Sequence, residues 1–524
     1  MKKIWMIVLL AVGMIACTQR NTPTDTTNTG DSDTPGDTGI NDDNVNDQNW
    51  SDTISIVWNG ASATVTGAND SLEITNSNGY VSINSSVTAT CIVYMLSGNG
   101  TGQLTIYGSY RHNITLNGLT LTCSDGPAIN NQCHKKCYLV INGTNTLTDG
   151  SSYASSSEDR KAAFFSEGQI IASGAGALTV KGNYKHAIAS DDYIHLTDGL
   201  TGTLSLTASS DGLHANDGIY ISGGNTTINA GNDGVQCDSV ILISGGALNI
   251  TATDKGIVDS LGITISGGTI VVSSKYKCIK TKANLLISGG DIQVICTGTS
   301  SGGGNPWGGG SSSSSSPEGI EAKGTITVTG GKVFAQANDD AINSGGDMTI
   351  SGGLVMAYST GNDGLDANGN CYIKGGTVYA IGASSPEVAI DANTEERKQL
   401  YVQGGTIVAI GGLESGASLT QSCYSASSVS KNTWYALYSG SDLAFVFKTP
   451  SSLSSSTFVV STSGTTSLKS GVTTSSGTSI LNGYALSNPT VSGGSSVSLS
   501  TYSGNSGGPG GGGGHGGGGR PGGW

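Results

Sequence analysis

Charged and aromatic residues are scarce in this chain of 524 residues, at 12% and 6% of the total. Lysine and arginine number only 24, against 38 aspartates and glutamates, so the formal net charge is −14. Phosphate binding needs clustered basic side chains, so we expect no nucleic acid partner, and the acidic balance suits cations instead. Alanine, glutamate, lysine and leucine, which sustain long helices, are few or scattered, and this composition argues against an ordinary helical enzyme.

Glycine is abundant, with 82 residues, and serine, threonine and asparagine accompany it. These residues favour turns and the edges of strands. The composition therefore predicts an all-β chain.

The N-terminal segment, 1–17, has the pattern of a secretion signal. Lys2 and Lys3 precede an apolar stretch over 4–15, which is too short for a membrane span, and Ala16 stands before Cys17. A small residue before this cysteine resembles a bacterial lipobox, which would make Cys17 a lipidated residue and the membrane a partner. The alternative is a plain signal peptide cut nearby. We expect an exported lipoprotein anchored at the outer membrane or cell surface.

Nine cysteines follow Cys17, an odd number that leaves at least one unpaired. Cys123, Cys133, His134 and Cys137 lie close together, but their spacing is not a recognised zinc pattern. Export favours disulfides over metal sites. We therefore expect buried thiols or a disulfide rather than zinc.

The strongest feature is an internal repeat of the form apolar-x-apolar-x-Gly-Gly-x-apolar-x-apolar. Its glycine pairs begin at Gly223, Gly245, Gly267, Gly289, Gly330, Gly352, Gly375 and Gly404. Successive starts differ in residue number by 22, 22, 22, 41, 22, 23 and 29. The regular interval gives a unit of about 22 residues, and the two long intervals carry insertions. A period of this size indicates a solenoid.

Each unit contains three short segments with alternating apolar residues, the mark of strands. The first two flank the glycine pair, and the third is centred on Leu213, Val235, Ile257, Ile279, Ile320, Ile342, Leu365 and Ile390. Three strands per coil, each pairing with its equivalent one coil on, predict a parallel β-helix with an apolar bore. A leucine-rich repeat is excluded because its consensus and helical side are missing.

These patterns divide the chain into five segments. We expect a signal peptide over 1–17, a flexible tether over 18–50, a β-helix over 51–412 with a cap to about 110, a separate antiparallel β segment over 413–503, and a glycine-rich tail over 504–524. A Gly/Ser loop over about 298–316 leaves one corner of the helix. We expect a monomer.

Equivalent residues on successive coils lie about 4.8 Å apart, so acidic positions form columns. Two unit charges at about 5 Å repel by roughly 3 kcal/mol at an effective dielectric near 20, so a proton or a cation should compensate them. Ca²⁺ suits several carboxylates on adjacent turns; solvated corner residues are the alternative. The first cluster comprises Asp211, Asp217, Asp233 and Asp238, with Asp191, Asp192 and Asp254 close by. The second comprises Asp339, Asp340, Asp363, Asp366 and Asp391.

A basic stretch lies between the two acidic clusters. It comprises Lys255, Lys275, Lys277, Lys280, Lys282 and Lys323. Calcium beside lysines suits a polymer that carries carboxylates, with Lys280 and Lys282 as carbohydrate-binding residues. A lysine with a lowered pKa could instead abstract a proton in β-elimination, for which Lys255, Lys277 and Lys280 are the candidates. Surface charge without a ligand is the third possibility.

Two outward columns contain large side chains. The second strand changes from Thr227, Asn249, Val271 and Gln293 to Phe334, Met356, Tyr379 and Val408. We expect residues 413–503 to pack over the apolar part of this column. Tyr372 and Tyr401 form another column and are the better candidates for stacking on sugars.

From about Ile114 to Gly412 the chain resembles the calcium-binding, carbohydrate-binding right-handed β-helix proteins of bacterial surfaces, which are similar in fold to pectate lyases. The segments 186–192 (HAIASDD) and 210–217 (SDGLHAND) carry the resemblance most clearly. It implies calcium and affinity for acidic or cellulosic polysaccharides. Ala187 and Lys255 depart from the family pattern.

Two hypotheses follow, together with a structural adhesin as a third possibility. The first is a non-catalytic carbohydrate-binding protein at the cell surface, which we favour because no single acid-base constellation is evident. The second is a calcium-dependent polysaccharide lyase, which similarity in fold alone does not establish.

Overall fold

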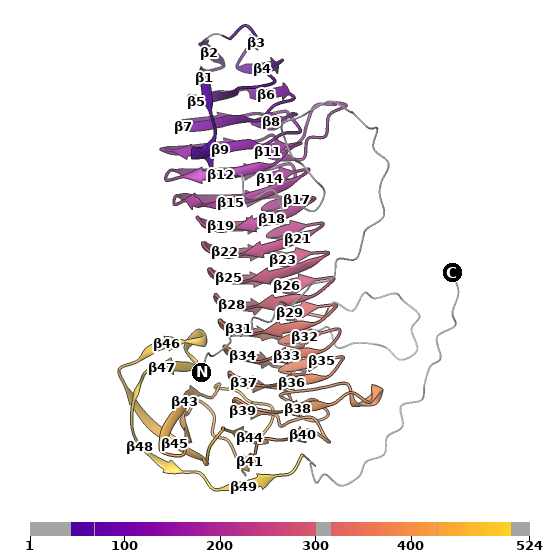
Figure 1. The fold of residues 1–524 in the computed structure, drawn as a ribbon, viewed down its shortest axis with the longest axis vertical. Coiled ribbons are helices and arrows are strands. Elements are labelled where there is room, and N and C mark those ends of the chain that lie inside the picture. The colour runs from indigo at the N-terminus through magenta and orange to yellow at the C-terminus, as the bar shows by residue number, and fades with distance from the viewer. Residues whose placement is uncertain (1–42, 68, 300–315, 427, 505–524) are drawn as a thin grey trace, which may run out of the picture. The chain divides into compact units, whose positions relative to one another are not determined.

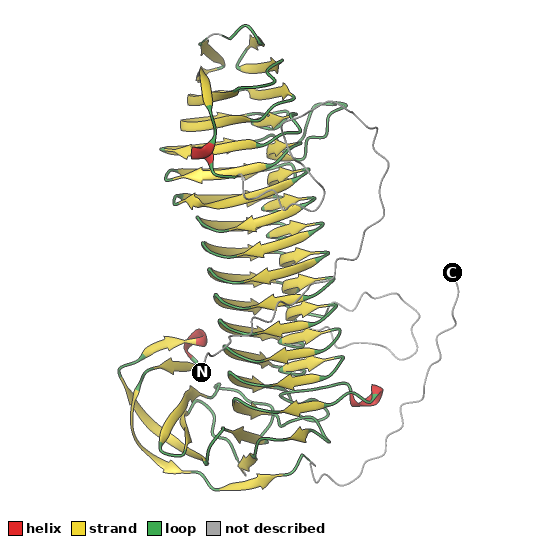
Figure 2. Ribbon diagram, in the orientation of Figure 1, coloured by secondary structure: helices red, strands yellow, loops and turns green. Residues whose placement is uncertain are grey.

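The computed structural model describes residues 43–67, 69–299, 316–426 and 428–504, and the features below belong to the unit Asn44–Trp524. The predicted signal peptide, Cys17, most of the tether, the centre of the Gly/Ser loop and the glycine-rich tail lie outside the described residues. Regular structure is almost entirely strand (Figure 2). The described helices are short 3₁₀ turns, η2 (Val45–Asp47), η3 (Thr394–Glu396) and η4 (Leu481–Gly483). None of them has the length and apolar character needed to cross a membrane.

The described strands stack in three columns (Figure 1). Column 1 comprises β1 (Trp50–Gly60), β5 (Cys91–Thr101), β7 (His112–Thr122), β9 (Cys137–Asn142), β12 (Ile170–Gly174), β15 (Tyr193–Leu200), β18 (Gly218–Ile221), β21 (Val240–Ile243), β24 (Gly262–Ile265), β27 (Leu285–Ile287), β30 (Ile326–Val328), β33 (Met348–Ile350), β36 (Cys371–Ile373), β38 (Leu400–Val402) and β40 (Ser418–Leu419). Column 2 comprises β10 (Thr144–Thr148), β13 (Ala177–Gly182), β16 (Thr203–Ala208), β19 (Asn225–Ala230), β22 (Ala247–Ala252), β25 (Thr269–Ser274), β28 (Asp291–Cys296), β31 (Lys332–Ala337), β34 (Leu354–Ser359), β37 (Thr377–Ile381) and β39 (Thr406–Ile410). Column 3 comprises β4 (Tyr80–Ser85), β6 (Gln103–Gly108), β8 (Ile129–Asn131), β11 (Ala162–Ser166), β14 (His186–Ser190), β17 (Leu213–Ala215), β20 (Val235–Cys237), β23 (Lys255–Asp259), β26 (Lys277–Thr281), β29 (Glu318–Ala322), β32 (Ile342–Ser344) and β35 (Leu365–Ala367).

Within each column the strands pair in parallel with the equivalent strand of the next coil. In the regular coils the partners are the same position of successive repeats, as in Ile219 with Ile241 and Ile241 with Ile263. The third strand of each coil is paired as predicted, from Leu213 with Val235 to Ile342 with Leu365, and Ile390 follows as an isolated bridge. The predicted all-β parallel β-helix is confirmed, with about 12 turns of roughly 23 residues.

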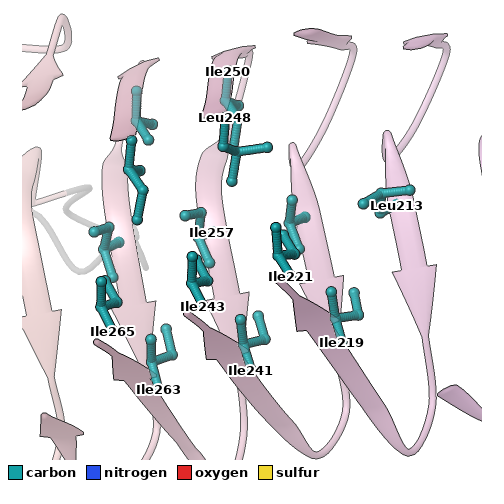
Figure 3. Packing of buried hydrophobic residues seen from close by; sticks show 14 of the residues in the cluster. Leu213, Ile219, Ile221, Ile241, Ile243, Leu248, Ile250, Ile257, Ile263 and Ile265 are labelled. Atoms are coloured by element: carbon teal, nitrogen blue, oxygen red, sulfur yellow. The ribbon is translucent and has the colours of Figure 1, made fainter. Parts of the chain in front are cut away.

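The bore is filled by the apolar residues that alternate along the strands. Isoleucine and leucine side chains from all three columns point inward. Figure 3 shows the equivalent residues Ile221, Ile243 and Ile265 in one row, with Leu248 and Ile257 entering the bore from columns 2 and 3. Each of these five is at most 2% exposed. Burial of one such side chain contributes about 1.5–3 kcal/mol, so the repeat stabilises itself coil by coil.

The glycine pair marks the corner between columns 1 and 2, and its two members are required for different reasons. A Cβ on Gly245 would lie 2.3 Å from the Ser222 carbonyl oxygen of the preceding coil. Gly246 has φ +73°, in the left-handed region that side chains disfavour. The corner therefore packs closely against the preceding coil, and the chain turns sharply there.

Antiparallel strands close the first end of the solenoid. β2 (Ser62–Thr66) pairs antiparallel with β1, and β3 (Leu72–Ser77) pairs antiparallel with β4. β1 already pairs in parallel with β5. The hairpins therefore occupy an edge that would otherwise recruit other chains.

Residues 413–503 were expected to form a separate antiparallel β segment, but their strands belong to two sheets. β41 (Cys423–Ala426), β44 (Phe458–Ser461) and β49 (Leu499–Tyr502) join the largest sheet, with β44 antiparallel to β39. The open edge of β39 needs a hydrogen-bonding partner, which explains this extension. A separate antiparallel sheet comprises β42 (Trp434–Ser439), β43 (Asp442–Lys448), β45 (Thr466–Ser475), β46 (Thr478–Ile480), β47 (Ala485–Ser487) and β48 (Thr490–Ser496).

The separate sheet covers the apolar outward column, as predicted. Phe334, Met356, Tyr379 and Val408 are at most 1% exposed and form one cluster with side chains of the C-terminal segment such as Phe447. The apolar residues therefore serve packing. The nine cysteines of the described residues are buried and none of them forms a disulfide, so of the two possibilities favoured above, buried thiols are found.

Replacing inward Ile243 by alanine should lower the free energy of unfolding by about 2–5 kcal/mol, because the bore cannot collapse around the cavity. Leu242, its neighbour in β21, faces outward and is only partly buried, so Leu242→Ala is the matched control and should have a much smaller effect. Urea unfolding followed by circular dichroism measures both. Equal losses for the two variants would contradict the inward packing.

Candidate functional site

The aspartates before column 3 have a structural partner that the sequence did not reveal. Asp211 Oδ1 accepts a hydrogen bond from the backbone N–H of Asp233 at 3.1 Å, and Asp233 Oδ1 accepts one from the N–H of Lys255 at 2.9 Å. Each carboxylate thus binds the amide of the equivalent residue on the next coil. Asp211 and Asp233 are 3% and 6% exposed, so they are not solvated corner residues.

The same arrangement recurs in the second cluster. Asp340 Oδ1 accepts the N–H of Asp363 at 3.1 Å, and Asp363 Oδ1 accepts the N–H of Val388 at 2.6 Å. Hydrogen bonds from amides satisfy part of each buried carboxylate. This ladder explains why aspartate recurs before the glycine of the third strand.

Two histidines flank Asp211. The Nδ1 atoms of His186 and His214 each lie 3.1 Å from Asp211 Oδ2, and the two imidazole rings stack with centroids 4.1 Å apart and planes 23° apart. Burial opposes ionisation of Asp211, but the hydrogen bonds with both histidines hold its pKa well below the usual range. Burial, aided by the proximity of His214, lowers the pKa of His186.

The other residues of the first predicted cluster find separate partners. Asp191 pairs with Lys161, Asp192 with Gln169, Asp238 with Gln236, and Asp254 with Lys255. For Asp217, burial and then the charge of Asp191 raise the pKa. Among the described residues, the groups of three potential ligands whose atoms lie within 4.8 Å of one another are His186–Asp211–His214 and Asp363–Asp366–Asp391. Of the first predicted cluster, only Asp211 belongs to such a group, and the two histidines beside it were not predicted as ligands.

The donors in the first group do not suit calcium, which prefers oxygen ligands. Two of its three donors are imidazole nitrogens. Both Nδ1 atoms lie 3.1 Å from Asp211 Oδ2, so the two imidazoles are already engaged with the carboxylate. This arrangement fits a hydrogen-bonded cluster around Asp211 better than it fits a Ca²⁺ site.

The second group offers only carboxylate oxygens. Asp363 lies before column 3, while Asp366 and Asp391 are neighbours in the outward column of that sheet. Asn343 Nδ2 joins the group to Asp340, since it donates to Asp340 Oδ2 at 2.9 Å and to Asp366 Oδ2 at 2.8 Å. Asp339, also predicted, is not a member of this group and accepts a hydrogen bond from Asn362.

These carboxylates are difficult to ionise together. Burial, together with the charge of Asp340, raises the pKa of Asp363 to about 8 although the Val388 amide opposes the shift. Burial and Asp340 raise the pKa of Asp366, and burial and the hydrogen bond with Glu414 raise that of Asp391. A proton or a cation is therefore required to stabilise the group near neutral pH.

The predicted basic stretch is paired with two buried glutamates. Lys277 Nζ lies 2.8 Å from Glu318 and 3.3 Å from Glu321, and Lys280 Nζ lies 3.5 Å from Glu321. Lys323 also pairs with Glu321. Lys282 instead donates to Ser260 at 3.2 Å. The glutamates were not selected from the sequence, although both lie in the acidic columns.

Lys255 is held between Asp233, at 3.5 Å, and Asp254. Burial opposes its charge, but the hydrogen bond with Asp254 and the charge of Asp233 raise its pKa above the usual value. A base for β-elimination needs the opposite shift. Burial also raises the pKa of Asp233, to about 6.

Tyr372 and Tyr401 stack as adjacent members of column 1. Their ring centroids are 4.9 Å apart with planes at 9°, and Lys374 Nζ lies 4.9 Å from the centroid of Tyr372. Both tyrosines are partly exposed. The predicted aromatic column is therefore present at the surface.

With divalent ions chelated, the melting temperature should decrease as the pH is raised from 5 to 9. A carboxyl with a raised folded-state pKa stabilises the fold as the neutral acid, fully below the unfolded pKa near 4, and this contribution is lost as pH rises through the folded pKa, about 8 for Asp363. Asp363→Asn keeps an oxygen for the Val388 amide but cannot ionise. It should therefore make the decrease in melting temperature smaller, by roughly 2–4 °C for each kcal/mol of pH-dependent stability that the substitution removes.

The control for this measurement is Asp291→Asn, because Asp291 is exposed and pairs only with exposed Lys332. Thermal melts followed by circular dichroism in chelator give the slope against pH. An unchanged slope in Asp363→Asn, relative to this control, would contradict the raised pKa.

Comparisons with known proteins gave a family match and a similarity to a solved structure. A family described as carbohydrate-binding domain-containing protein matches residues 77–262 and 258–364. The solved structure of a polysaccharide lyase-like protein from C. thermocellum, a gadolinium derivative, is 22% identical, with a TM-score of 0.38 over 53% of this chain and 96% of that chain. No curated protein matches. Because the matched segments together span more than half of its length, this chain belongs to the family of carbohydrate-binding domain-containing proteins.

Proposed function

We propose that this protein binds polysaccharide at a cell surface, on a β-helix that carries calcium, and that the polysaccharide contains uronates or is cellulosic. The observation that carries the carbohydrate role is the family match over residues 77–364. The solenoid supports it physically, since stacked coils provide a long outer face on which a polymer can lie across many equivalent positions.

Asp363, Asp366 and Asp391 are the residues we propose as calcium ligands, with Asp340 beside them. Their converging atoms are all oxygens, which suits Ca²⁺. Burial and mutual repulsion raise their pKa values, so a cation would stabilise the ionised group. When bound there, calcium would supply a positive charge able to attract a uronate carboxylate.

Lys280, Lys282, Tyr372 and Tyr401 remain our candidates for direct contact with the polymer. Lys280 is partly exposed at the end of the ion-paired stretch. The Lys282 ammonium donates to Ser260 and, within the described residues, forms no ion pair. The stacked tyrosines offer an apolar face to a sugar ring. The sequence pattern ending at Cys17 supports export and a lipid anchor, which would hold this face outside the cell.

The lyase alternative receives less support. Lys255 has a raised pKa, and Lys277 and Lys280 lie within ion-pair distance of buried Glu321. A lysine acts as a base only after it loses its proton, and the raised pKa of Lys255 favours its charged form. No specific observation favours a purely structural adhesin.

Polygalacturonate in a native gel should retard the chain, and calcium should strengthen the retardation relative to chelator. Asp363→Asn/Asp366→Asn should remove most of the calcium-dependent part, since it neutralises two of the three proposed ligands. Asp291→Asn, an exposed carboxylate outside the group, should behave as the unmodified chain.

The same gels with a soluble cellulose derivative test the second polymer class. Failure of both polymers to retard the chain would contradict the carbohydrate role, and retardation independent of calcium would contradict only the calcium proposal. Release of unsaturated uronides, detected by ultraviolet absorbance, would instead favour the lyase.

A further inference from the structure

A long excursion leaves the solenoid between β10 and β11, over residues 149–161. It is held against the preceding coils. The N–H of Ala154 donates to the Asp125 carbonyl oxygen at 2.8 Å. Glu158 accepts hydrogen bonds from the Tyr107 hydroxyl and from Asn130 Nδ2, the latter at 3.0 Å. The excursion is therefore fixed to columns on two earlier coils.

Tyr153 is the only aromatic residue in the excursion, and it is stacked on Tyr184. The ring centroids are 4.2 Å apart with planes at 24°. Tyr184 lies in the turn between β13 and β14. The Tyr153 hydroxyl donates to Asp149 Oδ2 at 2.7 Å, and Asp149 Oδ1 accepts the N–H of Asn183, so one buried carboxylate ties both tyrosines in place.

Packing alone does not account for Tyr184, which is 37% exposed. Tyr153 stacks on one face of its ring, so the exposed part of Tyr184 lies away from Tyr153. A rigid, partly exposed ring is a suitable surface for the C–H face of a pyranose, because little conformational entropy is lost on binding.

Two cations flank the tyrosine pair. Arg160 Cζ lies 5.9 Å from the centroid of Tyr153, and Lys185 Nζ lies 5.8 Å from the centroid of Tyr184. The nearby carboxylates are otherwise engaged, since Asp159 lies 3.3 Å from Lys161 and Glu158 binds Tyr107 and Asn130. Within the described part of the chain, Lys185 forms no ion pair.

We propose that Tyr153, Tyr184, Arg160 and Lys185 form a saccharide subsite for an acidic sugar unit, with the exposed part of Tyr184 against the sugar ring and the cations at its carboxylate. The inference rests on the proposed function, and names a second contact region for the same polymer. The four residues lie inside the family match over 77–262, whereas Tyr372 and Tyr401 lie beyond the matched residues. The subsite needs no metal ion.

The test measures binding of the full chain to polygalacturonate and to hydroxyethylcellulose in calcium-containing buffer. Tyr184→Ala should weaken binding to polygalacturonate by on the order of tenfold, and Tyr184→Phe, which keeps the ring, by about twofold at most. Lys185→Gln should weaken binding to polygalacturonate but not to the neutral polymer. Circular dichroism and melting temperature check that each variant folds.

Tyr276→Ala is the matched control, because Tyr276 is a partly exposed tyrosine with Lys275 at 5.2 Å but, among the described residues, no stacked ring. It should bind as the unmodified chain does. If the unmodified chain binds polygalacturonate and Tyr184→Ala binds equally well, the subsite is overturned and the proposed function stands. If the unmodified chain binds neither polymer, both fail. An equal loss for both polymers in Lys185→Gln would overturn the preference for acidic sugars.

Discussion

Each strand of the solenoid finds its hydrogen-bonding partner one coil along the chain, and the rest of the structure depends on this register. Because equivalent residues become neighbours, one apolar position per repeat produces a continuous filled bore, and one aspartate per repeat produces a carboxylate column. The glycine pair maintains the register at the corner, where Gly245 lies against the preceding coil. The side chain at one position of the repeat thereby determines the character of a whole face of the solenoid.

The carboxylate columns show how the same register has opposite electrostatic outcomes in different coils. Asp211 has two histidines against one oxygen and ionises easily, whereas burial and the charges of nearby carboxylates raise the pKa of Asp363 to about 8. In the coils between these two aspartates, Glu318 and Glu321 form ion pairs with Lys277. The acidic end of column 3 therefore has uncompensated charge, and this is where a cation would contribute most.

The fold could be predicted from the sequence because the period and the alternation are local patterns that any coil displays. The packing of the C-terminal segment over Phe334 and Tyr379 could also be predicted, because a contiguous exposed apolar strip needs a partner. The partners of the aspartates could not be predicted, because the backbone amide that binds Asp211 is a geometric neighbour with no side-chain signature. His186 and His214 could have been found, because His186 occupies the position of Asp211 one coil earlier and His214 follows Asp211 by three residues. The Tyr153–Tyr184 pair could not, since Tyr153 lies in an excursion that breaks the period.

The most direct test of this account is to delete one whole coil, residues 240–261, and compare it with deletion of the half coil 240–250. Val240 and Gly262 are register partners, so the whole-coil deletion joins equivalent positions and leaves every later strand with a matching neighbour. The half-coil deletion brings Thr251, from column 2, to a position of column 1. We expect the first variant to keep the β-sheet circular dichroism spectrum and to melt within about 5 °C of the intact chain. The second should aggregate or melt far lower. Equal behaviour of the two deletions would contradict the coil register on which the structure depends.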